Sequence, residues 1–94
     1  MEKLYLITIH WGTAPNTTKI ESALQPLGTW LRFSQHSWLF WSLRTSQEIY
    51  NALAPILTRE DFELILRVDE NDWYGFAQPW VWNWIRSKGA TLDK

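Results

Sequence analysis

Cysteine is absent from the 94-residue sequence, which excludes a disulfide framework, a thiolate metal site and a cysteine nucleophile. Only two histidines are present, so a tetrahedral zinc site would need carboxylates at both remaining positions. We therefore expect neither a metal nor another cofactor. Glycine-rich phosphate loops, nucleophile elbows and paired-carboxylate signatures are also missing, which argues against an enzyme.

The sequence also lacks a basic excess and a long hydrophobic run. Nine Lys and Arg residues stand against ten Asp and Glu residues, a formal net charge of −1. Nucleic-acid binders usually carry a positive excess, so the charge does not favour a nucleic-acid partner. The longest apolar run is far below the ~20 residues of a membrane span, and Met1–Leu4 does not resemble the start of a signal peptide. We predict a cytoplasmic protein without membrane association.

Tryptophan, by contrast, is abundant, with eight residues: Trp11, Trp30, Trp38, Trp41, Trp73, Trp80, Trp82 and Trp84. Each brings roughly 150–250 Å² of surface that favours burial. A chain of this size buries only about 60–65% of its unfolded surface. We therefore expect part of the aromatic surface to meet a partner. The length fits a single domain over residues 1–94.

Two capping boxes, Thr18–Glu21 and Thr45–Glu48, each open an apolar stripe at helical spacing, which predicts two helices. Pro26 and Pro55 fall near the ends of these helices and should shorten or kink them. A third proline suits the first turn of a short helix over Pro79–Ser87.

Four segments have the apolar or alternating pattern of strands: Leu4–Ile9, Trp30–Phe33, Trp38–Trp41 and Phe62–Val68. The element order is β-α-β-β-α-β followed by the short helix. This order predicts an α+β fold, the ferredoxin-like sandwich, with a four-stranded antiparallel sheet in the order 4-1-3-2 and both long helices on one face. We divide the domain into a core over 3–68, a Trp-rich C-terminal segment over 69–88 and a loose tail over 89–94.

The first and third strands are apolar on both faces, although the two helices cover only one. An exposed apolar face usually marks an interaction site. Either a second copy of the chain or its own Trp-rich C-terminal segment should cover it, and we favour a homodimer. The residues expected on this dimer or sheet face are Tyr5, Ile7, Ile9 and Trp41.

Three tryptophans are candidates for a surface that binds a protein partner. If Pro79–Ser87 is helical, Trp80, Trp84 and Ile85 anchor it, and Trp82 points outward, unless Trp82 only covers its own sheet. Trp11 and Trp73 fall in predicted loops. Together, Trp11, Trp73 and Trp82 form the candidate partner-binding set.

Other sequence features have weaker functional readings. Trp73–Phe76 is either an aromatic platform for a base or a sugar, or a hydrophobic clasp that holds a loop. Asp69–Asp72 fails the calcium-loop spacing. His10 ends the first strand, a favoured place for chemistry, but no nucleophile or carboxylate lies beside it in the sequence.

Several short motifs together resemble a known group of proteins: Tyr5–Thr8, Leu27–Trp30, Ser37–Phe40, Thr45–Ile49, Trp73–Phe76 and Trp84–Ile85. The chain resembles small bacterial ferredoxin-like proteins of unassigned role, which are similar to the small CRISPR adaptation nuclease subunit. The resemblance implies a ferredoxin-like domain that dimerises through its sheets. It also implies that His10 stands where the nuclease branch has a metal-binding aspartate, and an imidazole is a poor ligand for a magnesium-like cation.

These observations support three hypotheses. The first is a non-enzymatic homodimeric interaction or regulatory module with a Trp-rich partner surface. The second is a metal-dependent nuclease similar to the CRISPR subunit, with His10 in an adapted site. The third is a single-stranded nucleic-acid binder that stacks bases on tryptophans.

Overall fold

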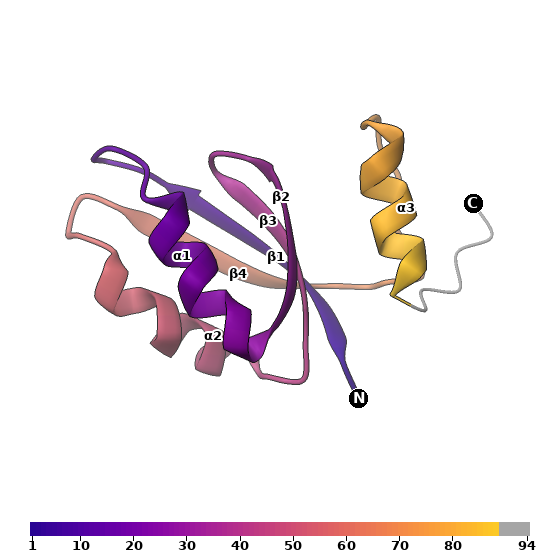
Figure 1. Ribbon diagram of the computed structural model, residues 1–94, viewed down its shortest axis with the longest axis horizontal. Coiled ribbons are helices and arrows are strands. Elements are labelled where there is room, and N and C mark those ends of the chain that lie inside the picture. Colours follow the sequence, from indigo (N-terminus) through magenta and orange to yellow (C-terminus); the bar gives the residue numbers. More distant parts are fainter. Residues whose placement is uncertain (89–94) are drawn as a thin grey trace.

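A computed structural model describes residues 1–88, and Figure 1 shows the arrangement of its elements. The protein is an α+β structure. In chain order, its strands and α-helices are β1 (Lys3–His10), α1 (Thr17–Leu24), β2 (Gly28–Ser34), β3 (Ser37–Ser42), α2 (Ser46–Leu53), β4 (Phe62–Val68) and α3 (Pro79–Ser87). This order is the predicted one, and β4 and α3 have the predicted bounds. The predicted loose tail over 89–94 lies outside the described residues.

The four strands form one antiparallel sheet in the order β2-β3-β1-β4, which is the predicted 4-1-3-2 read from the opposite edge. The central strands β1 and β3 are the two that are apolar on both faces. The strands with more polar residues, β2 and β4, form the edges. Strand order therefore matches burial, because β1 and β3 contain fully buried residues, whereas β2 and β4 contain only half-buried and exposed ones.

The N-termini of α1 and α2 are capped differently. At α2, the predicted capping box is confirmed, since Thr45 Oγ1 accepts from the Glu48 N–H at 3.2 Å and Glu48 Oε1 accepts from the Thr45 N–H at 3.0 Å. At α1, the predicted box at Thr18 is wrong, because Asn16 caps the helix and accepts from the Lys19 N–H at 3.4 Å.

The reason for the difference at α1 is a competing use of Glu21. Its Oε2 accepts a hydrogen bond from the Trp38 Nε1–H at 3.0 Å and forms an ion pair with Arg32 at 3.1 Å. The Glu21 carboxylate therefore binds two side chains of the sheet, whereas the local pattern predicts that it caps the helix. Both helices end as the prolines predict, in short 3₁₀ turns over Gln25–Leu27 and Ala54–Ile56.

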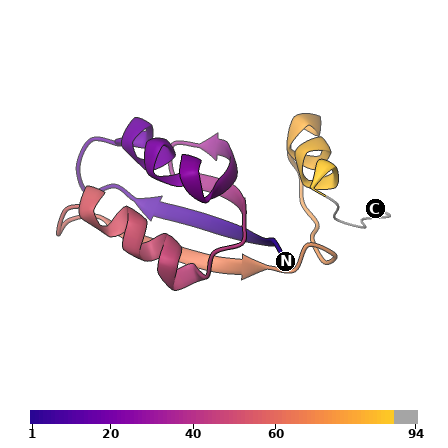
Figure 2. The same cartoon turned by 60° about the horizontal axis from the view of Figure 1, so that its bottom comes forward.

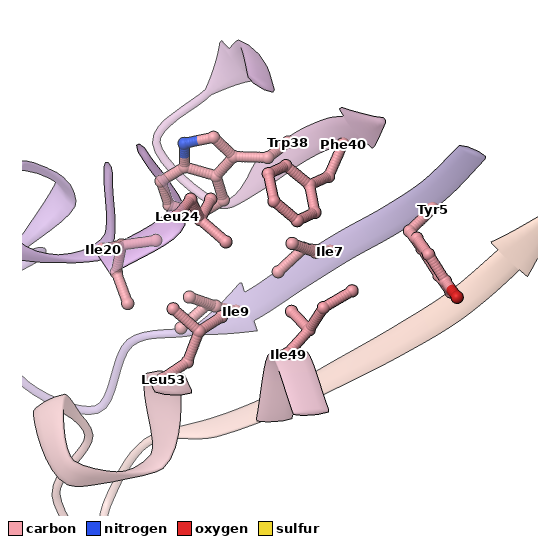
Figure 3. Close-up of a cluster of buried hydrophobic side chains, with 9 residues drawn as sticks. All are labelled: Tyr5, Ile7, Ile9, Ile20, Leu24, Trp38, Phe40, Ile49 and Leu53. Atoms are coloured by element: carbon pink, nitrogen blue, oxygen red, sulfur yellow. The ribbon is translucent and has the colours of Figure 1, made fainter. Parts of the chain in front are cut away.

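Helices α1 and α2 lie on the same face of the sheet (Figure 2). Between them and the sheet lies the main core, shown in Figure 3, which contains Tyr5, Ile7, Ile9, Ile20, Leu24, Trp38, Phe40, Ile49 and Leu53. The prediction that Tyr5, Ile7 and Ile9 lie on the dimer or open face of the sheet is therefore wrong, because they lie on the face that the helices cover. Strand β1 is apolar on both faces, so alternation separates the two sets of side chains without telling which set meets the helices.

One carboxylate ties the loop after β1 to the turn before β4. Asp61 Oδ1 accepts from the backbone N–H groups of Gly12 at 2.7 Å and Thr13 at 3.2 Å, and Oδ2 accepts from the Thr58 N–H at 2.9 Å. These hydrogen bonds, led by the one from Thr58, lower the pKa of Asp61 to about 2. Only glycine fits at position 12, because an added Cβ would overlap the backbone carbonyl of Glu60.

We predict that Asp61→Asn lowers the stability of the protein at neutral pH, since an amide holds these N–H groups less strongly than a carboxylate. The folded-state pKa of Asp61 is depressed, so its contribution is present above the unfolded value of 3.8 and is lost as the pH falls through about 2. Urea unfolding above pH 3.8 and near pH 2 measures this contribution to stability. The control is Glu60→Gln, which removes a neighbouring exposed charge, and equal effects of the two substitutions would contradict the prediction.

Candidate interaction surfaces

The second face of the sheet is partly covered by the C-terminal segment of the same chain. Val81 and Ile85 of α3 pack with Leu4 of β1 and Leu39 of β3 in a second buried cluster. Figure 1 shows α3 set apart from α1 and α2. The sequence left open whether a second copy or the C-terminal segment covers this face, and the structure shows the C-terminal segment there. The predicted face residue Trp41 is half-buried at this cluster.

Two of the predicted partner-binding tryptophans stack on each other over this second cluster. The rings of Trp73 and Trp82 lie 4.7 Å apart between centroids with an interplanar angle of 9°. The guanidinium of Arg86 lies 6.0 Å from the Trp73 ring, a cation–π distance. Both tryptophans are half-buried, so each also keeps exposed surface. Within the aromatic run, Trp73 is held against α3, whereas Tyr74 and Phe76 are fully exposed, so the clasp alternative holds for Trp73 alone.

The third predicted tryptophan lies apart from this pair. Trp11 packs against the main core under α1 and α2, and its Nε1–H donates to the carbonyl of Gln35 at 2.8 Å. The structure therefore does not bring Trp11, Trp73 and Trp82 into one surface.

The anchoring of α3 also differs from the prediction. Trp80 was expected to be buried and is 48% exposed, whereas Trp82 packs inward. Val81 and Ile85 lie one turn apart on the same face of α3, and they are its buried residues because this face packs against the sheet. Trp84 is half-buried at the cluster, as expected of an anchor.

Exposed aromatic side chains gather beside α3. Phe33 of β2 is 42% exposed, Trp80 is 48% exposed, and Phe76 is fully exposed. These three side chains line a groove of about 560 Å³, whose lining is Phe33, Phe76, Ala77, Gln78, Pro79, Trp80 and Val81. We call it the aromatic groove. Sequence reasoning missed its residues, although Phe76 belongs to an aromatic run that it had noted.

A second exposed apolar surface follows β4. Phe62, Leu64 and Leu66 are 60%, 53% and 49% exposed. They lie on the face away from α1 and α2, because they pair with the even-numbered residues of β1. The alternation along β4 that the sequence predicted is therefore correct. The sequence did not show that this apolar face is exposed. Alternation predicts a strand with one buried face, and it does not tell whether another element covers that face.

The catalytic candidate His10 stacks its ring on Phe62 at 4.7 Å between centroids with an interplanar angle of 14°. Within residues 1–88, no group of three or more His, Asp or Glu side chains is placed to hold a metal ion. None of the helices among these residues has the length and apolar content needed to cross a membrane.

One carboxylate in the described chain lacks compensation. Glu63 of β4 pairs with Ile9 and points to the side of the sheet that the helices cover. Both of its carboxylate oxygens are shielded from solvent, and neither has a hydrogen-bond partner. Two adjacent hollows between α2 and β4 are both lined by Glu63 and Tyr50. Desolvation by burial raises the pKa of Glu63 to about 7.

We predict that Glu63 makes the protein less stable as the pH rises from about 4.5 to about 7. Its folded pKa is raised, so in this range the folded state holds a proton that the unfolded chain has released. Allowing for the part of the side chain that remains in contact with water, the loss is on the order of 1–2 kcal/mol. Glu63→Gln should remove this loss of stability with rising pH, because an amide does not titrate in this range.

The measurement is urea unfolding across this pH range at high dilution, with the exposed substitution Glu60→Gln as the control. If Glu63→Gln unfolds with the pH dependence of the unsubstituted chain, Glu63 is not the group responsible.

Comparison with known protein families finds no family model that matches this chain, and no curated protein or solved structure matches it either.

Proposed function

We propose that the protein is a non-enzymatic homodimeric module that presents an aromatic, Trp-rich surface to a protein partner in an interaction or regulatory role. The observation that carries this proposal is the aromatic groove. Phe33, Phe76 and Trp80 are exposed and line one hollow. Contiguous exposed apolar surface marks interaction sites, and aromatic residues dominate the energetic centres of such sites.

The proposed fold family is the ferredoxin-like sandwich. The strand order and the position of α1 and α2 on one face are what that family requires, since each of these helices connects two strands of the same sheet. The resemblance of the short motifs to small CRISPR-subunit-like proteins points to the same family and to dimerisation.

The groove suits an apolar segment of a protein better than a nucleic acid. Its lining consists of aromatic and small residues with one amide, Gln78, and no Lys or Arg. A nucleic-acid site combines stacking aromatics with basic side chains that neutralise phosphates.

The first test of this proposal uses the dye 1-anilinonaphthalene-8-sulfonate, an aromatic probe of exposed apolar surface. We expect the protein to enhance its fluorescence, and the double variant Phe76→Ser with Trp80→Ser to lose most of the enhancement, because both side chains line the groove. The control is Tyr74→Ser, which removes a fully exposed aromatic from the same loop that is not part of the groove lining. Equal losses in the control and the double variant would argue against the groove.

The second test is the oligomeric state. Sedimentation equilibrium of the full chain should give the mass of a dimer, because exposed apolar surface remains on the sheet after α3 has docked. A monomer across the accessible concentration range would contradict the homodimeric part of the proposal.

A third test separates this proposal from the nuclease hypothesis. Labelled RNA and duplex DNA incubated with the protein and magnesium or manganese should remain intact, because His10 is committed to a ring stack with Phe62. Cleavage that disappears in His10→Ala would favour the nuclease.

A further inference from the structure

The outer edge of β4 exposes backbone groups in a defined pattern. The Ile9 N–H donates to the carbonyl of His36 at 2.7 Å, so the odd-numbered residues of β1 direct their backbone groups toward β3. Its even-numbered residues therefore face β4, where they pair with Phe62, Leu64, Leu66 and Val68. The remaining β4 residues direct their N–H and C=O groups away from the sheet, and these residues are Glu63, Ile65 and Arg67.

The sequence of β4 is self-complementary about its centre. In an antiparallel pair of two β4 strands centred on Ile65, Ile65 lies opposite its own copy, and Glu63 lies opposite Arg67. These are the residues whose backbone groups are free, so each of them forms a hydrogen-bonded pair. On the other face, the same register sets Leu64 opposite Leu66 and Phe62 opposite Val68, so apolar residues meet apolar residues.

The charges of the single chain fit this register. Glu63 has a shielded carboxylate without a hydrogen-bond partner. The Arg67 side chain is half-exposed and its guanidinium contacts Glu70 at 3.4 Å, three residues along the chain. Glu63 and Arg67 of one chain are four residues apart on the strand, which is about 13 Å, too far for them to meet. Directly opposite residues have Cβ atoms about 4.5–5.5 Å apart. A second copy therefore places Glu63 of each chain beside Arg67 of the other chain.

The other edge of the sheet is less suited to strand pairing. Strand β2 has a register irregularity between Arg32 and Ser34, and Arg32 is committed to the ion pair with Glu21. An irregular register at an edge strand is a common protection against edge pairing. Strand β4 has a regular register with β1 over seven residue pairs, contains no proline, and exposes three large apolar side chains along its length.

We infer that the partner of the β4 edge is the β4 edge of a second copy of this chain, paired antiparallel about a two-fold axis at Ile65 to make one continuous sheet. This inference rests on the proposed homodimer and names its interface. It leaves the aromatic groove of each copy free, because that groove is lined by β2, by loop residues 76–78 and by the first turn of α3, and not by β4.

The test uses single cysteines, which the chain allows because it has none of its own. In the inferred register, position 64 of one copy lies opposite position 66 of the other in a non-hydrogen-bonded pair, with Cα atoms about 4.5 Å apart. This separation suits a disulfide. Positions 64 and 64, or 66 and 66, are offset by two residues along the strands and lie about 8 Å apart, beyond bridging distance.

We expect a mixture of Leu64→Cys and Leu66→Cys proteins, one of them tagged, to form a covalent heterodimer on mild oxidation, while each variant alone forms little. Both leucines are about half exposed, so the substitutions leave the core intact. The matched control is a mixture of Phe62→Cys and Leu66→Cys, which has exposed cysteines on the same strand and face but out of register. Equal cross-linking in the control would overturn the inferred register.

A charge exchange gives an independent readout by sedimentation. Arg67→Glu should raise the dissociation constant of the dimer by about tenfold or more, because Glu63 of each chain would then lie opposite an acidic side chain of the other chain. The double variant Glu63→Arg with Arg67→Glu should restore dimerisation. If the unsubstituted chain is a dimer but neither the cysteine mixture nor Arg67→Glu behaves as expected, the β4 interface is overturned and the proposed homodimer stands. If the unsubstituted chain is a monomer, both are overturned.

Discussion

The two-sided burial of β1 is the constraint on which the rest of the structure depends. The strand lies between β3 and β4, and its side chains alternate between the two faces of the sheet. Ile7 and Ile9 pack beneath α1 and α2, and Leu4 packs beneath α3. A strand that is apolar on both faces must be covered on both. The chain meets this requirement with two helices on one face and a third helix on the other.

The two covers differ in extent, and this difference creates the exposed surfaces. Helix α3 has nine residues and reaches the region around Leu39 in β3. It leaves Leu64 and Leu66 of β4 open to solvent. At the other side of α3, Trp80 stays exposed because Val81 and Ile85 make the contact with the sheet. The aromatic groove and the apolar face of β4 are therefore consequences of one geometric fact, the incomplete cover of the second face. They also lie at different places, so one can serve a second copy while the other serves a different partner.

Local features were predictable where neighbouring residues decide them. The capping box at Thr45, the 3₁₀ endings at Pro26 and Pro55, and the bounds of β4 and α3 all depend on residues within a few positions of one another. The cap at Thr18 failed because Glu21 binds partners on strands that are distant in sequence. The roles of the tryptophans in α3 failed for a related reason, since helical periodicity defines the faces of a helix without stating which face meets the sheet.

By itself, the amino-acid sequence determined the order of the elements, the bounds of β4 and α3, the alternation along β4, and the choice of central and edge strands. These properties follow from periodicity, capping and the number of apolar faces, all of which are local. Only the tertiary structure decided which face of β1 meets the helices, which tryptophans remain exposed and that Glu63 has no compensating group. These depend on which segments far apart in the sequence come into contact, because a side chain's cover and charge partners are supplied by other elements.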